Sequence, residues 1–199
     1  MTHQSRAVWQ RLIEEARAAH RAHEELTAFC PFPDDLQEQD VAAHRIAPAD
    51  LLEGESGLFS SGFAGLRDAF VAASPFAKWR ETYKNTGIGD DFLNRFGCYC
   101  LIGAGGAFHS EQMWAYVVYM PEGLHYPWHH HPGEEAYVVL GGEAEFYRHG
   151  EEQQVLREGG MSVHGPNQPH AMTTKEHPVM AYVVWRNGFD VGPQLTENL

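Results

Sequence analysis

Residues 123–142, GLHYPWHHHPGEEAYVVLGG, carry the side chains best suited to bind a metal ion. Residues two apart on a β-strand point to the same face, so His129 and His131 can converge while His130 points the other way. Glu135 follows His131 with the same parity, and Tyr137 continues that face. Two imidazoles and a carboxylate cannot be buried without partners except at a large cost in free energy. A divalent metal ion removes that cost, so the pattern predicts a metal site.

A fourth ligand is expected from another strand of the same fold. The preferred candidate is His170, because it follows a turn rich in Gly, Pro and Asn, and His164 is its competitor. Histidine and carboxylate ligands suit Zn, Fe, Mn, Co or Ni equally well. The sequence therefore predicts one divalent metal ion as cofactor and leaves its identity open.

The spacing of these residues resembles the two motifs of the cupin superfamily. The pattern Gly123-x5-His129-x-His131-x3-Glu135-x6-Gly142 matches the first motif at every position, and Gly159-x10-His170 resembles the second. The second motif departs from the pattern because Gly165 replaces a proline and Asn167 replaces a glycine. Asn tolerates the left-handed backbone that such a turn needs. The resemblance implies a double-stranded antiparallel β-barrel, of the jelly-roll type, with a centre of three histidines and one glutamate.

A finer resemblance concerns HYPWHHHPGEEAYVVLGGEAEF and the preceding AYVVYMPEGL, which lie behind a helical N-terminal half. These stretches are similar to the bacterial cupin-type dimethylsulfoniopropionate (DMSP) lyases. The resemblance implies that His131, Glu135 and His170 are metal ligands near Tyr137, with His129 completing the general cupin set. It also implies that Tyr126, five residues before His131, is catalytic. His131 and His170 are one residue further apart than the family predicts.

The implied reaction converts DMSP into dimethyl sulfide and acrylate by β-elimination. A metal ion on the carboxylate would stabilise the charge that develops when the α-proton leaves. Tyr126, with Tyr137 as its neighbour, is our candidate general base, provided that nearby positive charge lowers its pKa from about 10. The cationic sulfonium should lie near aromatic faces. Candidate substrate-binding residues are Trp114, Tyr116, Trp128, His164, Tyr182 and Trp185.

The elements that position these residues change in type near Gly87. Before it, apolar residues recur at three- and four-residue spacing over residues 6–28, which indicates an amphipathic helix. Further helices are expected over residues 48–52, 63–73 and 76–83. After Gly87 the period becomes two, and Gly141-Gly142 resembles a hairpin turn. The predicted strands are residues 95–102, 113–120, 135–140, 143–148, 154–156, 161–164 and 179–185.

These patterns predict a mainly β cupin barrel with an N-terminal α-helical extension. Residues 1–86 should form a helical region that packs on the barrel, and residues 87–199 should form the barrel with the metal site. The N-terminal segment contains Glu14, Glu15, Glu24 and Glu25, so its helices do not suit DNA. We expect them to cover the barrel or to form a homodimer surface.

Composition excludes several classes of partner. The formal net charge of the 199-residue chain is -13, and no stretch concentrates Lys and Arg, which argues against nucleic acid and anionic membranes. The N-terminus is too charged for a signal peptide, and no apolar run is long enough to span a membrane. Three cysteines without disulfide spacing suit a reducing compartment. We therefore expect a cytoplasmic protein that acts on a small molecule.

Two other functions are compatible with the same residues. Another metal-dependent cupin enzyme, either an iron dioxygenase or an isomerase of sugars or keto acids, would use the same ligands. An oxygenase, however, has no need for Tyr126. A non-catalytic cupin that binds or senses a ligand ranks third.

Overall fold

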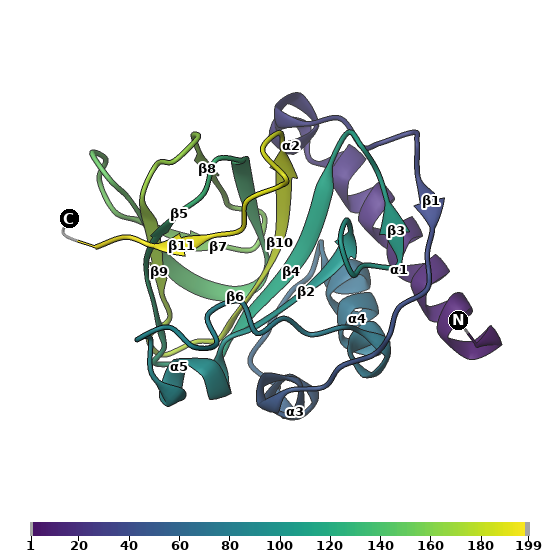
Figure 1. Ribbon diagram of the computed structural model, residues 1–199, viewed down its shortest axis with the longest axis horizontal. Helices are drawn as coiled ribbons and strands as arrows, with labels where there is room; N and C mark the ends of the chain where they lie inside the picture. Colours follow the sequence, from purple (N-terminus) through teal and green to yellow (C-terminus); the bar gives the residue numbers. More distant parts are fainter. Residues whose placement is uncertain (1, 198–199) are drawn as a thin grey trace.

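The computed structural model of this chain describes residues 2–197; the helices of residues 3–73 lie on one side of a β-barrel, and the short helix of residues 90–95 lies at the lower end of the barrel (Figure 1). The helical elements are α1 (His3–Ala22), α2 (Glu24–Phe29), α3 (Ala47–Gly54), α4 (Ala64–Ala73), the short 3-10 helix η1 (Ser74–Phe76) and α5 (Asp90–Arg95). The strands are β1 (Gln37–Glu38), β2 (Gly97–Ile102), β3 (Phe108–His109), β4 (Trp114–Met120), β5 (His125–His130), β6 (Glu134–Arg148), β7 (Gln154–Arg157), β8 (Met161–His164), β9 (His170–Thr173), β10 (Val179–Arg186) and β11 (Gln194–Leu195). The predicted fold class, a mainly β cupin-type barrel with an N-terminal helical extension, is confirmed.

One long sheet wraps into the barrel and places the two cupin motifs side by side. Its strand order is β1-β3-β2-β4-β10-β6-β9-β5-β11, and β7 and β8 also pair with β6. The first motif lies on β5 and β6, and the second ends at β9, which pairs with both of them. Antiparallel pairing therefore brings residues far apart in sequence into contact at the metal site.

Both faces of β4 and β10 are buried, because helices cover one face and the barrel interior lies on the other (Figure 1). Along β10, Met180, Tyr182 and Val184 pack in the core beneath the helices. The alternate residues Val183 and Trp185 pack inside the barrel. The period of two thus decides which side chains of β10 can reach the site.

The long first helix is anchored by its apolar face, as the spacing predicts. Trp9, Leu12 and Ala16 are buried on that face, and α1 packs closely on α4. The helical pattern is interrupted at His23, whose backbone is extended and whose ring accepts a hydrogen bond from the N–H of Leu26. The single predicted helix over residues 6–28 is therefore two helices.

The hairpin turn predicted at Gly141-Gly142 is wrong, because β6 continues through both glycines. The pairing with β10 shifts by one residue just before them, at Leu140, which marks a β-bulge. Gly142 has a φ of +76°, and a Cβ atom at this position would lie 1.8 Å from the carbonyl oxygen of Pro178. Glycine is required here so that one strand can bend between two parts of the barrel.

The helix predicted over residues 76–83 is also wrong. Only η1 is helical there, and the chain then runs extended beside β2. The backbone N–H of Trp79 donates to His44, and that of Arg80 donates to Cys98. Trp79 is fully buried against Tyr99, so tertiary packing outweighs the local preference for a helix.

The sequence reasoning also missed α5 and did not include β5 or β9 among its strands. Among residues 2–197, no helix combines the length and the apolar character needed to cross a membrane.

Candidate metal centre and active site

Strand pairing gathers the candidate ligands and their neighbours at one end of the barrel interior. His129 on β5 pairs with His170 at the start of β9. Glu135, near the start of β6, lies opposite His164 on β8 and Trp185 on β10. Glu135 is therefore enclosed by side chains from both neighbouring strands.

Three of the predicted ligands form one compact group, namely His131, Glu135 and His170. Their ligand atoms all lie within 4.8 Å of one another, and each residue is 2% exposed. The Nε2 atoms of His131 and His170 lie 3.2 and 3.0 Å from Oε2 of Glu135. Neither nitrogen makes a hydrogen bond, although buried polar atoms normally do. A divalent ion would satisfy both nitrogens and the carboxylate, so these residues fit the predicted cofactor.

Backbone carbonyls orient the imidazoles of His129, His131 and His170. In each case Nδ1 lies 2.8–2.9 Å from a carbonyl oxygen two residues away. Because a carbonyl only accepts hydrogen bonds, each Nδ1 must carry the proton, which leaves Nε2 free to bind a metal. The ring of His129 lies 4.1 Å from that of His170 between centroids, but His129 is outside the compact group.

Glu135 is held by hydrogen bonds to both carboxylate oxygens. The indole N–H of Trp185 donates to Oε1 at 2.5 Å, and Nδ1 of His164 lies 3.0 Å from Oε2. Burial would raise the pKa of Glu135, but the close imidazoles of His131, His164 and His170 hold it well below its usual range. Burial, with the nearby His170, lowers the pKa of His164 to about 3. His164 is therefore neutral near pH 7 and positions the carboxylate.

The two candidate catalytic tyrosines lie beside the ligand group. The ring of Tyr126 stacks on His129 at 3.9 Å between centroids, and its hydroxyl lies 2.7 Å from that of Tyr83. Both Tyr126 and Tyr137 line a small cavity that Glu135 also borders. Burial raises the pKa of both tyrosines well above the usual value. Each hydroxyl is therefore protonated unless a cation binds beside it.

The predicted substrate-binding aromatic residues divide between this cavity and other surroundings. Tyr116 and Trp185 line the cavity. Trp114 stacks on Phe189 instead, at 5.0 Å between centroids. The structure places three of the predicted residues outside the lining of the cavity, and these are Trp114, Trp128 and Tyr182. His164 is likewise outside the lining and contacts Glu135 from β8.

Parity explains why two of these aromatic side chains do not reach the cavity. Trp128 has the opposite parity to the buried His129, and its ring lies near Tyr147. Tyr182 lies on the helix-facing side of β10 and packs against Phe70. By the same rule, His130 contacts Thr196 rather than the ligand group.

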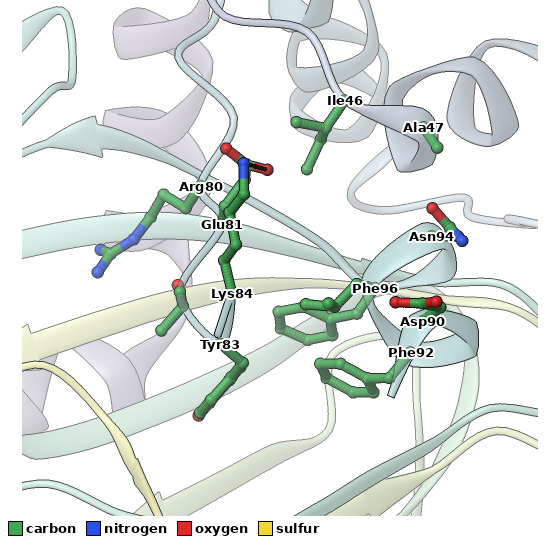
Figure 2. A pocket seen from close by; sticks show the side chains of 12 residues that line it. Ile46, Ala47, Arg80, Glu81, Tyr83, Lys84, Asp90, Phe92, Asn94 and Phe96 are labelled. Carbon is green, nitrogen blue, oxygen red and sulfur yellow. Dashed lines mark ion pairs between the residues drawn. The ribbon is translucent and has the colours of Figure 1, made fainter. Parts of the chain in front are cut away.

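Arg80 and Tyr83 at the site were missed by the sequence reasoning. Arg80 ends the extended segment that precedes the barrel and lines the small cavity, and Tyr83 lies in the turn that follows. Figure 2 shows the ring of Tyr83 beside Phe92 and Phe96, at a second cavity of about 300 Å³. No motif in the sequence marks these two residues, because their role depends on packing against β2.

Comparisons with known proteins identify a family over most of the chain. The model of the dimethylsulfoniopropionate lyase family matches residues 13–181. The dimethylsulfoniopropionate lyase DddQ of Ruegeria pomeroyi strain DSS-3 is 45% identical over 193 residues, which are 97% of this chain and 96% of that protein.

Solved structures agree with the sequence comparison. The crystal structure of DddQ from Ruegeria pomeroyi DSS-3 superposes with a TM-score of 0.94 at 45% identity and covers 96% of each chain. A second crystal structure, from a study of the DMSP lyases RdDddP and RnDddQII, has a TM-score of 0.93 at 39% identity. That match covers 97% of this chain and all of the other.

Proposed function

This chain belongs to the dimethylsulfoniopropionate lyase family, and on that basis we propose that it cleaves DMSP to dimethyl sulfide and acrylate by metal-dependent β-elimination. Family membership and the 45% identity to DddQ support the activity of a carbon–sulfur lyase. The observation that supports metal dependence is the pair of unpartnered Nε2 atoms, on His131 and His170, that face Glu135.

The ligand set would hold one divalent ion, with His131, Glu135 and His170 as ligands and His129 as the further candidate. When bound, such an ion supplies Lewis-acid stabilisation of the negative charge that develops beside the substrate carboxylate. His164 and Trp185 hold the Glu135 carboxylate in one orientation by hydrogen bonds to its two oxygens. Zn, Fe, Mn, Co and Ni all suit this donor set.

Tyr126 is the proposed general base, and Tyr137 is its neighbour at the ligand group. The base removes the proton on the carbon next to the carboxylate, and the C–H electron pair forms the new double bond. The C–S bond breaks, and its electron pair leaves on neutral dimethyl sulfide. Tyr126 must therefore be a phenolate before this step and becomes a phenol in it. The hydroxyl of Tyr83, 2.7 Å from that of Tyr126, can donate a hydrogen bond to that phenolate before it takes the proton.

The cavity requires a change in shape before the substrate can bind. Its volume is about 30 Å³, which suits one water molecule and is too small for DMSP. The larger outer cavity shares Arg80, Thr82 and Phe96 with it. We infer that displacement of this shared rim joins the two cavities and admits the substrate.

The direct test is the release of dimethyl sulfide into the headspace above purified protein supplied with DMSP and each candidate metal in turn. We expect release that requires one of these metals and is abolished by a chelator. No release above the blank with every metal would refute the proposed activity.

Tyr126→Phe tests the assignment of the base, with Tyr147→Phe as the matched control outside the cavity. We expect the Tyr126 variant to keep its metal and to lose elimination by about 100-fold or more, which is the usual contribution of general base catalysis. Turnover close to that of the control would remove Tyr126 from the mechanism.

A further inference from the structure

Arg80 brings a positive charge to the cavity beside the candidate metal ligands. Its backbone N–H donates to Cys98 of β2 at 2.8 Å, which fixes the residue at the barrel wall. Its guanidinium lies 4.9 Å from the centre of the Tyr116 ring. Arg80 and Tyr116 line the same cavity as Glu135 and Tyr126. A cation is therefore held in the space that the substrate must enter.

Within residues 2–197, Arg80 is not part of any ion pair with a carboxylate. Other arginines of the chain do pair with acids, as Arg186 does with Glu134 and Arg148 does with Glu151. Figure 2 shows the guanidinium of Arg80 turned away from Glu81, which instead pairs with Lys84. Arg11, Arg17 and Arg21 on α1 also lack a carboxylate partner among the described residues, but none of them lines this cavity.

The side chains that do surround Arg80 cannot balance its charge. Among them are two thiols, and burial raises the pKa of Cys98 to about 11, so it is neutral near pH 7. Burial likewise raises the pKa of Cys100 and of Tyr116. The guanidinium carbon lies over the Tyr116 ring, and a guanidinium has five N–H donors, more than one phenol can accept. A planar anion is the ligand that these donors fit.

We propose that Arg80 donates hydrogen bonds to the carboxylate of the substrate, alongside the metal ion, and so holds the carboxylate end of the molecule, rather than the sulfonium end, beside the ligand group. This inference rests on the proposed function, because DMSP carries a carboxylate at one end and a sulfonium at the other. The guanidinium attracts the carboxylate as a bidentate partner and repels the sulfonium. The product acrylate keeps the carboxylate, so Arg80 binds the product as well.

The test compares Arg80→Met and Arg80→Lys with Lys78→Met, a control that removes a nearby exposed charge outside the small cavity. All proteins carry the same metal, with its content measured. Two quantities are measured: the Kd of propionate by calorimetry and the KM for DMSP. For Arg80→Met we expect both to rise roughly 30-fold, or about 2 kcal/mol, with unchanged metal content. For Arg80→Lys, the propionate Kd and the KM for DMSP should lie between those of the wild type and those of Arg80→Met. For Lys78→Met, both should match the wild type.

A second substrate separates loss of recognition from loss of folding. The neutral amide of DMSP lacks the anion, so the wild type should discriminate against it and Arg80→Met should discriminate less. Unchanged propionate affinity in Arg80→Met overturns the proposal for Arg80. Absence of dimethyl sulfide release by the wild type refutes the proposed function instead, and the propionate measurement still decides the role of Arg80.

Discussion

Trp185→Phe should weaken metal binding although Trp185 is not a candidate ligand. The substitution removes the indole N–H that donates to Oε1 of Glu135 at 2.5 Å. A phenyl ring can still stack on His131, whose ring lies 4.0 Å from that of Trp185 at an angle of 25°. A hydrogen bond to a charged group contributes about 1.5–3 kcal/mol. At about 1.4 kcal/mol per factor of ten, the metal Kd should rise roughly 10- to 100-fold.

The assay is a competition titration of the metal-free protein against a chelator of known affinity. Trp114→Phe is the matched control, because Trp114 stacks on Phe189 and does not contact the ligand group. The rise in metal Kd expected for Trp185→Phe agrees with the usual effect of removing a hydrogen-bond partner of a metal ligand. If both variants bind the metal within about twofold of the wild type, Trp185 does not orient Glu135 and our reasoning on this hydrogen bond is wrong.

Three further predictions concern other contacts of the fold. Tyr83→Phe should leave the hydroxyl of Tyr126 without its partner, which should lower the free energy of unfolding in urea by about 1–3 kcal/mol. The same variant should lower kcat by a larger factor than it changes KM. An unchanged kcat would show that Tyr83 is not coupled to the base. Burial would raise the pKa of Glu158, but backbone and hydroxyl donors of residues 60–63 hold it at about 2. Its stabilising contribution is therefore present above about pH 4.5 and lost as the pH falls towards 2, so the stability difference between wild type and Glu158→Gln should shrink over that range; a constant difference in denaturant titrations would contradict this. Finally, a metal at 100 times its Kd should stabilise the protein by about 2.7 kcal/mol, and His170→Ala should show a much smaller rise in Tm on metal addition.

The spacing of apolar residues predicted the helices and strands whose packing is regular. It failed where backbone contacts between distant segments determine the local conformation. The spacing of apolar residues identified α1, and alternation identified β4 and β10 to within one residue at each end. Gly141-Gly142 has the composition of a hairpin turn, but both glycines pair with β10 beside a bulge at Leu140, and the carbonyl of Pro178 leaves no room for a side chain at Gly142. That carbonyl belongs to the residue just before β10, far from Gly142 in sequence, so the local composition around Gly142 could not reveal the contact.

The candidate site shows the same division between local pattern and distant packing. Parity within residues 129–137 separated the buried His131 and Glu135 from Glu134, which faces outward and pairs with Arg186. Trp185 was expected as an aromatic surface for the substrate, and its bond to Glu135 depends on the register between β6 and β10. Register between distant strands does not follow from the pattern of either strand alone.

The helical half of the chain contributes to the site as well as covering the barrel. Arg80 and Tyr83 precede the first barrel strand, and both reach the cavity region because the segment pairs with β2. That pairing is held by Trp79, which packs on Tyr99 in the core shared by helices and sheet. We infer that the barrel motifs supply the metal ligands while the preceding segment supplies the contacts to the substrate carboxylate and to the base. Changes in the core beneath the helices should therefore alter substrate affinity before they alter metal binding.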